Sequence, residues 1–497
     1  MKKPAYKWVA LSVTTIGSLM VALDSTIVIL GLPAMLQDLH SNLVLMTWVI
    51  TGYLLVTTIL MLTFGRMADM FGRVKLYNLG FIVFTAGSVL CGLSPTDKVL
   101  IGMRILQGLG GAMLAANAMA IITEVFPPEQ RGQAMGINAI TWGGGSILGP
   151  VLGGFILAVA SWRWIFLVNL PIGVIGTLAA YLLLHDIAPN PKGERFDVLG
   201  AILFSAGLIC LLLGITEGIG NGWLSSPILT LLVVGAVAMV AFVFWERHAA
   251  YPMLDLRLFD NRRYAFSVAA AMLQALAVFA VQFLLIFYLQ GVRGYSPLTA
   301  AFLILPMPVI MSTLGPFGGR LADHIGGTIP ATLGLVAQCV ALVVLMLLTP
   351  TTPYLALALA LVLMGTGSGF FWPANTSTTM SAAPRNRLGV AAATLNTLRN
   401  VGTIFSYAVA LAVTAAAMPP ALVSAVFLGT VGHLKPSISL AFTDGMSRAF
   451  LASLVICLVA IICSIARGGK PSSTWPKQQI APAASVETTE PEKTVVD

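Results

Sequence analysis

The chain has 497 residues, of which 58% are hydrophobic and only 9% charged, with a mean hydropathy of +0.92. Because a soluble domain carries about a quarter charged residues and about half apolar ones, this composition excludes an ordinary soluble protein and indicates an integral membrane protein. The net charge of +8 does not indicate a nucleic-acid partner, since most Lys and Arg fall in loops on one side of the predicted spans, as in cytoplasmic loops.

Runs of about 20 mostly apolar residues predict the membrane-spanning helices. The N-terminal run follows MKKPAYKW and lacks a small-residue cleavage site, so it is interpreted as an uncleaved first span rather than a signal peptide. An even number of spans after a basic N-terminus places both termini in the cytoplasm. The fourteen predicted spans are 8–32, 43–64, 76–94, 99–124, 133–159, 164–184, 197–217, 227–246, 265–290, 297–319, 328–349, 353–376, 388–415 and 446–466.

An internal repeat is visible in the loop after the second span, where Leu60–Leu76 reads LMLTFGRMADMFGRVKL. A second copy, GGRLADHIGG, occupies Gly318–Gly327, and the matching residues stand at a constant offset of 254. Six spans with their loops, at about 30 residues each, would give an offset of roughly 190. The observed offset exceeds this value by enough residues for two more helices. We therefore expect an all-α membrane protein with two six-helix bundles and two extra helices between them.

The repeat and the spans divide the chain into predicted parts. An outer hairpin is expected near 416–445, where Val, Phe and Leu surround a glycine. The two extra helices lack intramembrane charge until Glu217 and are expected at the periphery. The parts are a first bundle (1–190), two additional helices with a cytoplasmic linker (191–263), a second bundle (264–467) and a disordered, polar, proline-rich tail (468–497).

Charged residues at membrane depth are costly to bury and therefore indicate functional sites. Asp24 lies about two-thirds along the first span, and Arg104 lies early in the fourth. At 1.5 Å per residue, both are roughly 8–12 Å below the outer boundary, so the two side chains can meet. Gln107 shares the helix face of Arg104. We expect Asp24 and Arg104 to couple protons to transport, with helix packing or a structural salt bridge as the alternative.

The glycine-rich run Trp142–Gly154 lies wholly inside an apolar span. No strand precedes it and no Lys-Ser/Thr pair follows it, so it is not a phosphate-binding loop. Gly145, Gly149 and Gly153 recur at four-residue spacing, which allows close helix contact, and Pro150 bends the helix. We expect a helix-packing face, with a role in gating left open.

Polar residues inside the spans are the candidates for a substrate cavity. Asn396, Arg399 and Asn400 cluster about a third of the way into the thirteenth span. Arg399 has no acidic residue in any neighbouring second-half span. Three roles are open for its side chain: binding an anionic group, pairing with a residue across the cavity, or reaching the cytoplasmic surface. The other predicted cavity residues, each with a helix–helix contact as the alternative, are Gln107, Asn138, Trp142, Gln274, Gln282, Trp372 and Asn375.

No catalytic or metal-binding pattern accompanies these residues. The five cysteines lie in apolar runs without metal-ligand spacing, so we expect neither a disulfide nor a metal site. All five histidines lie in predicted loops, and no HExxH or nucleotide-binding motif occurs. We therefore expect no cofactor and no enzymatic activity. An Asp24–Arg104 pair argues against a passive channel.

Together these motifs resemble the major facilitator superfamily, specifically its fourteen-span drug:proton antiporters, over residues 8–466. GRMADMFGRVK (65–75) resembles the family's signature between the second and third helices, and LDSTIVILGLP (23–33) its first-helix motif. RILQGLGGA (104–112) resembles the fourth-helix motif, whose arginine is linked to proton transfer. GSILGPVLGG (145–154) resembles the fifth-helix motif associated with antiporters.

The resemblance implies roles for residues that act in conformational change. Asp69 would help to lock the outward-facing state, and Arg73, Glu124 and Arg131 would join its charge network. Gly149 and Pro150 would shape the fifth helix at the interface between the halves. The full predicted set is Gly65, Asp69, Gly72, Arg73, Glu124, Arg131, Gly145, Gly149, Pro150, Gly153 and Asp323.

The resemblance also implies proton-coupled export of amphiphilic drugs or other small organic molecules across a bacterial-type cytoplasmic membrane, by alternating access. The expected partners are the substrate, protons and the lipid bilayer, with room for a periplasmic adaptor, and the chain is expected to act as a monomer. A metabolite or lipid exporter, or a symporter of the same fold, is the alternative. Family members that export multiply charged cations carry further acidic residues in second-half helices. This sequence has none there, so anionic or neutral substrates remain open.

Overall fold

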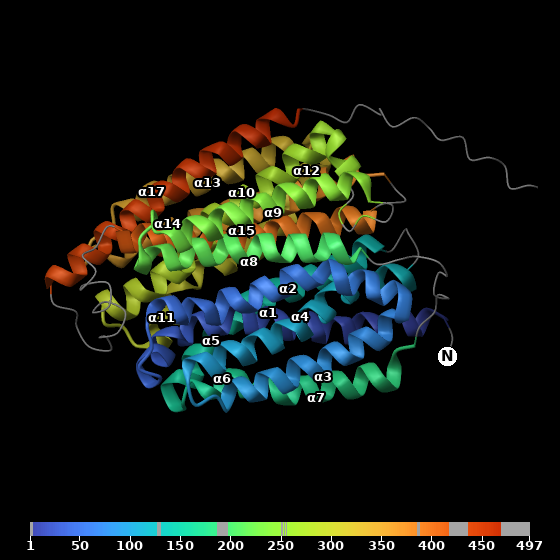
Figure 1. The fold of residues 1–497 in the computed structure, drawn as a ribbon, viewed down its shortest axis with the longest axis horizontal. Coiled ribbons are helices and arrows are strands. Elements are labelled where there is room, and N and C mark those ends of the chain that lie inside the picture. Colours follow the sequence, from blue (N-terminus) through green and yellow to red (C-terminus); the bar gives the residue numbers. More distant parts are fainter. Residues whose placement is uncertain are drawn as a thin grey trace, which may run out of the picture.

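The computed structural model describes residues 3–126, 131–185, 197–249, 252, 254, 256–384, 388–416 and 436–468. All regular elements within these residues are helices (Figure 1). The first half contains α1 (Lys3–Asp38), α2 (Leu43–Phe71), α3 (Arg73–Gly92), α4 (Asp97–Val125), α5 (Arg131–Val159), α6 (Arg163–Leu167) and α7 (Asn169–Leu183). Between the halves lie α8 (Val198–Asn221) and α9 (Ser226–His248).

The second half begins with a short 3₁₀ helix, and its first long helix ends in a π turn. Its elements are η2 (Leu256–Asp260), α10 (Arg262–Phe287), η3 (Tyr288–Val292), α11 (Pro297–Ile304), α12 (Pro306–Ile325), α13 (Thr328–Met346), α14 (Tyr354–Ala382), α15 (Leu388–Ala416) and α17 (Pro436–Ala466). The helix α17 ends on the side of the bundle where α1 begins, which we call the N-terminal side; the opposite end is the far side (Figure 1).

The number of membrane-crossing segments agrees with the sequence prediction. In the described part of the chain, 13 helical segments are long and apolar enough to cross a bilayer, and the apolar part of α2, Leu45–Met61, adds a fourteenth. The last span differs from its predicted start, because α17 already begins at Pro436. The expected hairpin lies mostly outside the described residues, as does the expected tail after Gly468.

Prolines interrupt two of the spans. The sixth span is divided at Val168 into α6 and α7, three residues before Pro171. The tenth span is divided at Leu305, directly before Pro306. A proline has no backbone N–H to donate, so each of these prolines removes one hydrogen bond of the helix, which accounts for both breaks. The first break matters for the site, because α7 starts with Asn169.

The two copies of the repeated loop have the same backbone conformation. Gly72 between α2 and α3 has φ 107°, and Gly326 after α12 has φ 89°. Each glycine donates its N–H to a carbonyl four residues earlier, that of Ala68 at 2.9 Å and that of Ala322 at 3.0 Å. Positive φ is strained for any residue with a Cβ, so the glycines preserved between the copies have a structural reason.

Contacts between the two halves concentrate on the far side. One buried cluster there combines the segment Ile27–Leu36 of α1 with α10, α13, α14 and α17. The Gln290 amide donates to the Leu30 carbonyl at 3.3 Å. A Cβ added to Gly154 of α5 would lie 2.9 Å from Leu298 Cα on α11. The halves are therefore tightly packed at this end.

Toward the N-terminal side, two buried clusters each belong to one half. One includes Tyr6 and Ile121 of the first half, and the other includes Tyr264 and Leu395 of the second. A third cluster crosses between the halves, because it combines Leu55 of α2 with residues of α8 and α15. The described halves are thus joined on the far side and along α2, α8 and α15, while each half also has a core of its own near the N-terminal side.

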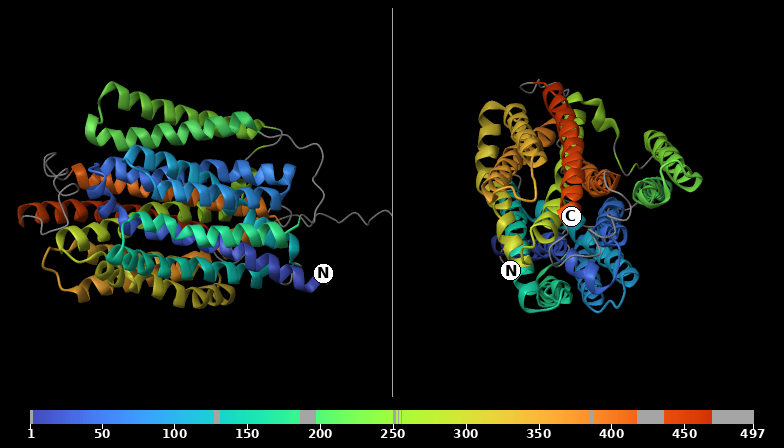
Figure 2. Two further views of the ribbon diagram at one scale, coloured as in Figure 1. Left: turned by 90° about the horizontal axis from the view of Figure 1, so that it is seen from below. Right: turned by 90° about the vertical axis from the view of Figure 1, so that its left-hand side faces the viewer.

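The two extra helices lie along the outside of the bundle (Figure 2). The side chains of Phe204, Leu208 and Leu212 on α8 pack with Leu55 of α2 and Ile404 of α15. Most side chains of α9 point away from the protein, as expected for a lipid-facing helix. The helix α8 therefore bridges the two halves along one seam, and α9 packs mainly against α8.

Candidate functional site

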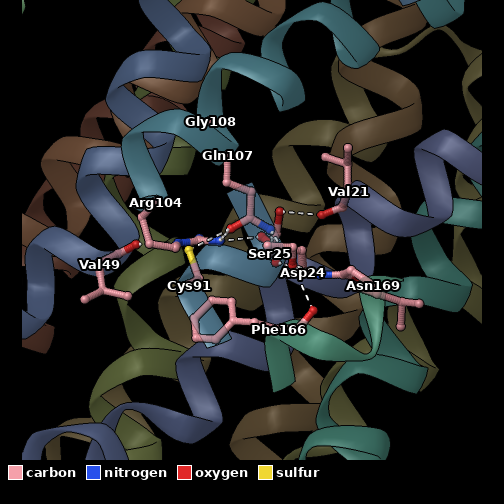
Figure 3. Close-up of polar contacts among 12 residues, drawn as sticks. Val21, Asp24, Ser25, Val49, Cys91, Arg104, Gln107, Gly108, Phe166 and Asn169 are labelled. Carbon is pink, nitrogen blue, oxygen red and sulfur yellow. Dashed lines mark hydrogen bonds and ion pairs between the residues drawn. The ribbon is translucent and has the colours of Figure 1, made fainter. Parts of the chain in front are cut away.

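A fully buried ion pair joins α1 to α4 (Figure 3). Arg104 Nη1 lies 2.7 Å from Asp24 Oδ2, and the two side chains are 1% and 0% exposed. The structure thus brings together the two residues that the sequence placed at one depth. A buried charge is tolerated only when it is paired and its remaining hydrogen-bonding groups are satisfied, so the neighbours of this pair decide its properties.

Two amides complete the shell of the Asp24 carboxylate. Gln107 Nε2 donates to Asp24 Oδ1 at 2.8 Å, and Asn169 Nδ2 donates to the same oxygen at 3.1 Å. Both amides also donate to Ser88 Oγ, at 3.1 and 3.0 Å. With Arg104, the carboxylate has three side-chain donors from α4 and α7, which replace the water that burial removes.

Arg104 is fixed from several directions. Its Nε donates to the Val49 carbonyl at 2.8 Å, and its Nη1 also donates to Gln107 Oε1 at 2.6 Å. The guanidinium lies over the Tyr53 ring, 4.2 Å from the centroid. A planar guanidinium can make all of these contacts at once, whereas a lysine ammonium cannot. The arginine therefore links α1, α2 and α4 through one side chain.

The chemistry available at this site is proton binding at a carboxylate. A proton on Asp24 would cancel its charge and leave Arg104 as a buried cation without a counter-ion, which is costly. Asn169 Oδ1 is buried and accepts no hydrogen bond in the described structure, so a rotated amide could accept from a protonated carboxyl. Among the described residues, no group of three His, Cys, Asp or Glu is placed to hold a metal ion.

Comparison with known proteins identifies the family. The model of the Major Facilitator Superfamily matches residues 14–407, which include the buried pair and both copies of the repeated loop. The chain belongs to the Major Facilitator Superfamily.

Relatives of this major facilitator protein include named transporters. The chain is 33% identical to the riboflavin transporter RibZ of Clostridioides difficile over 406 residues, covering 80% of this chain and 87% of RibZ. It is 31% identical to the multidrug resistance protein Stp of Mycobacterium tuberculosis over 444 residues, covering 89% of this chain and 80% of Stp. The chain is therefore a membrane transporter by family.

Solved structures support the same fold. A bacterial homologue of the human lysosomal transporter Spinster, in an inward-facing and unoccupied conformation, superposes with a TM-score of 0.65 at 16% identity. The match covers 94% of this chain and 99% of that one. At this identity the likeness concerns the fold alone, and it confirms the major facilitator architecture predicted from the sequence.

The glycine row of α5 packs against α1 in the same half. A Cβ added to Gly145 would lie 2.6 Å from Ala22 Cβ, and one added to Gly153 would lie 2.8 Å from Ile27. Gly149 approaches Thr26 in the same way, and Pro150 is buried within α5. The contact that reaches the other half comes instead from the neighbouring Gly154, so this row does not itself form the interface between halves.

The charge network predicted at the N-terminal side is described only in part. Arg73 Nη1 lies 3.2 Å from Glu124 Oε2, which links α3 to α4. Gly65 lies within α2, and a Cβ there would meet no other atom within 4 Å. The side chains of three predicted members of this network lie outside the described residues: Asp69, Arg131 and Asp323.

Three residues predicted to line the cavity are instead fixed in contacts between helices. The Asn138 amide donates to Ser18 Oγ at 2.9 Å, which joins α5 to α1. Gln274 is fully buried and donates to Gln338 Oε1 at 3.3 Å. Asn375 is also buried; it donates to the Ser267 carbonyl and accepts from Arg467. Gln107, predicted for the cavity, lies in the shell of Asp24 as described above.

The other predicted cavity residues are at least partly accessible. Trp142 on α5 is 38% exposed, and Gln282 and Asn396 are half-buried. The Arg399 guanidinium lies 5.6 Å from the centroid of the Trp372 ring. The structure thus pairs two of the predicted residues, from α15 and α14, at one place in the second half.

The sequence analysis missed Ser88, Asn169 and Tyr53 as members of the site. Each is a common residue type in an otherwise apolar span, where a helix–helix contact is the ordinary interpretation. One signal was present for Asn169, because it stands two residues before a proline inside a span. Such a break frees backbone groups and changes the direction of the helix.

Proposed function

We propose that this major facilitator protein exports amphiphilic small organic molecules in exchange for protons. The observation that carries the proposal is the sealed Asp24–Arg104 pair with its amide shell, since a buried carboxylate in a membrane transporter is suited to proton binding. The relative named for multidrug resistance supports export rather than uptake. The site of action is a bacterial-type cytoplasmic membrane, with the N-terminal side and both termini in the cytoplasm.

The proposed mechanism couples protonation to a movement of helices. Protonation of Asp24 removes the charge that holds Arg104, and the guanidinium must then find another partner or rearrange. Because Arg104 also contacts Val49 and Tyr53 on α2, a change at the pair alters how α1, α2 and α4 pack. We propose that this change favours one of two orientations of the halves, as alternating access requires.

The driving force is sufficient for efflux. One proton moving inward across 100 mV releases about 2.3 kcal/mol. At about 1.4 kcal/mol per factor of ten, this supports roughly a 50-fold gradient of a neutral substrate.

The test uses proteoliposomes that enclose a pH-sensitive dye, with wild type and Asp24→Asn compared. Addition of a substrate to wild type should move protons, and Asp24→Asn should abolish this movement because the amide cannot take up a proton. Asp38→Asn is the matched control, since Asp38 is the last residue of α1, forms an ion pair with Arg163 and is 49% exposed. Equal proton movement in wild type and Asp24→Asn would refute coupling through Asp24.

A second candidate function is the export or uptake of one specific metabolite. It is favoured by the relative named as a riboflavin transporter. Screening chemically unrelated amphiphiles in the same vesicles separates the two functions. Proton exchange with several of them supports a multidrug exporter, and exchange with a single compound supports a dedicated transporter.

A further inference from the structure

An arginine whose side chain has neither an ion pair nor a hydrogen bond with the described residues lies deep in the second half. Arg399 stands 11 residues after the start of α15 at Leu388, and Trp372 stands 10 residues before the end of α14 at Ala382. At 1.5 Å per residue, both lie about 15 Å from the N-terminal side of their helices. The cation–π contact between them therefore lies at the depth of a membrane-embedded binding site.

The described residues leave the Arg399 guanidinium without an acceptor. Within these residues no hydrogen bond or ion pair involves its side chain, whereas Arg104 and Arg293 each have several acceptors. Arg104 has the carboxylate described above, and Arg293 donates to the carbonyls of Pro350 and Thr352. Arg399 is only half-buried, and its side-chain nitrogens are not among the buried polar atoms that lack a hydrogen-bond partner. Its unused donors thus face space that protein does not fill.

Among the described residues, no acidic side chain of the second half pairs with Arg399. Asp444 is on α17 near the far side, where it pairs with Arg448 at 3.0 Å. Asp24 already has three donors in the first half. A substrate group that enters from the N-terminal side would therefore meet a positive charge that no described acidic residue compensates.

We infer that Arg399 and Trp372 form a binding site for the anionic group of an aromatic substrate, such as a carboxylate or sulfonate. A guanidinium binds such a group through two parallel hydrogen bonds, and this geometry gives both affinity and orientation. The indole supplies a flat apolar surface beside the bound group. The inference rests on the proposed function and names its substrate class: cations are disfavoured because they would meet a like charge.

An anionic substrate also changes the charge carried in each cycle. Export of a monoanion in exchange for one proton moves two positive charges inward, whereas export of a neutral molecule moves one. Export of the anion should therefore depend more steeply on the membrane potential than export of a neutral analogue.

The first experiment measures binding without any gradient. Purified protein in detergent is titrated with three probes of similar shape: naphthalene sulfonate, the neutral methyl naphthyl sulfone and naphthyl trimethylammonium. Wild type should bind the sulfonate at least tenfold more tightly than the other two. Arg399→Gln should weaken sulfonate binding roughly 10- to 100-fold, as expected for loss of a charge-assisted hydrogen bond, and should leave the sulfone unchanged.

Two further variants separate charge from geometry and from folding. Arg399→Lys keeps the charge but loses the planar pair of donors, so it should retain part of the preference for the sulfonate. Arg448→Gln makes the same substitution at an arginine that is 60% exposed on the far side, and it should bind all three probes as wild type does. If Arg399→Gln fails to fold, the affinities of wild type for the three probes still test the inference, because a site for anions must bind the sulfonate most tightly.

The outcomes distinguish this inference from proton coupling. Asp24→Asn should keep the preference for the sulfonate over the other two probes and yet exchange no protons for it. If wild type binds the trimethylammonium probe as tightly as the sulfonate, or if Arg399→Gln leaves sulfonate binding intact, the anion site is refuted while coupling through Asp24 stands. If Asp24→Asn still exchanges protons while the sulfonate preference holds, coupling is refuted and the anion site stands.

Discussion

At the scale of single residues, the Asp24 site is a carboxylate whose water has been replaced by protein donors. Arg104 supplies the charge, and Gln107 and Asn169 supply two further hydrogen bonds at 2.8 and 3.1 Å. A hydrogen bond to a charged group stabilises more than one between neutral groups. The three donors together therefore hold the buried carboxylate in place.

This account predicts the effect of removing one donor. In Asn169→Leu, the buried carboxylate loses one of its three donors. A hydrogen bond to a charged group is worth about 1.5–3 kcal/mol, so the free energy of unfolding should fall by about that amount. The measurement is thermal unfolding of the purified protein in detergent, where the melting temperature should be lower than that of wild type.

Asn117→Leu is the control, because the only described acceptor of the buried Asn117 amide is the uncharged Met113 carbonyl of its own helix. Loss of a neutral hydrogen bond should cost about 1 kcal/mol, so its melting temperature should fall less than that of Asn169→Leu. Equal melting temperatures in the two variants would show that Asn169 does not stabilise the Asp24 carboxylate.

At the scale of helices, α5 packs against α1 through glycines spaced four residues apart. The absence of side chains at Gly145, Gly149 and Gly153 lets the α1 residues Ala22, Thr26 and Ile27 approach the α5 backbone. Thr26 Oγ1 also donates to the Gly145 carbonyl at 3.2 Å. Because Asp24 lies on α1 between Ala22 and Thr26, this close contact helps to fix the height and rotation of the acidic residue.

A pair of neighbouring glycines tests this packing. Gly145→Val places a branched side chain against Ala22 and should destabilise the protein by about 1–3 kcal/mol, as overpacking of a tight contact does. Gly144→Val adds the same side chain where a Cβ meets no atom within 4 Å, and it should leave stability nearly unchanged. Thermal unfolding in detergent should show a melting temperature lower by several degrees for Gly145→Val alone; equal melting temperatures would contradict the contact.

At the scale of the whole molecule, the two halves meet in one continuous cluster on the far side and in a second cluster along α2, α8 and α15. The repeat explains why two similar bundles exist, and the equal backbone conformation of Gly72 and Gly326 extends the similarity to the loops. The helix α8 packs against both α2 and α15. Any rocking of the halves must therefore slide along α8 or carry it with one half.

A side chain placed between the halves should change the balance between their orientations. Gly154→Leu inserts four carbons against Leu298 and Ala301 on α11, so the far side should close less well and transport should slow. A cysteine at Gly315, where a Cβ meets no atom within 4 Å, reports the orientation through its rate of alkylation. That rate should fall at least twofold in Gly154→Leu.

Gly102→Leu is the matched control, since Gly102 is exposed on α4 and a Cβ there also meets no atom within 4 Å. It should change neither transport nor alkylation. If Gly154→Leu behaved in the same way as this control, the far-side contact would have no part in setting the orientation.

The sequence by itself determined the number of spans, the internal repeat and the depth of the buried charges. These follow from local properties: about 20 apolar residues cross a bilayer, each helical residue rises 1.5 Å, and duplicated segments keep a constant offset. The pairing of Asp24 with Arg104 could be predicted for this reason, because two opposite charges at one depth in lipid have few other partners.

Only the tertiary structure decided which helix faces which. The rotation of a span depends on packing against segments distant in sequence, so the sequence could not show that Gly145, Gly149 and Gly153 face α1, or that Gln107 lies beside Asp24 instead of lining a cavity. It also could not show Asn169 beside Asp24, because that contact requires the break before Pro171 and the approach of α7 to α1. Depth follows from local sequence, whereas partners depend on long-range packing.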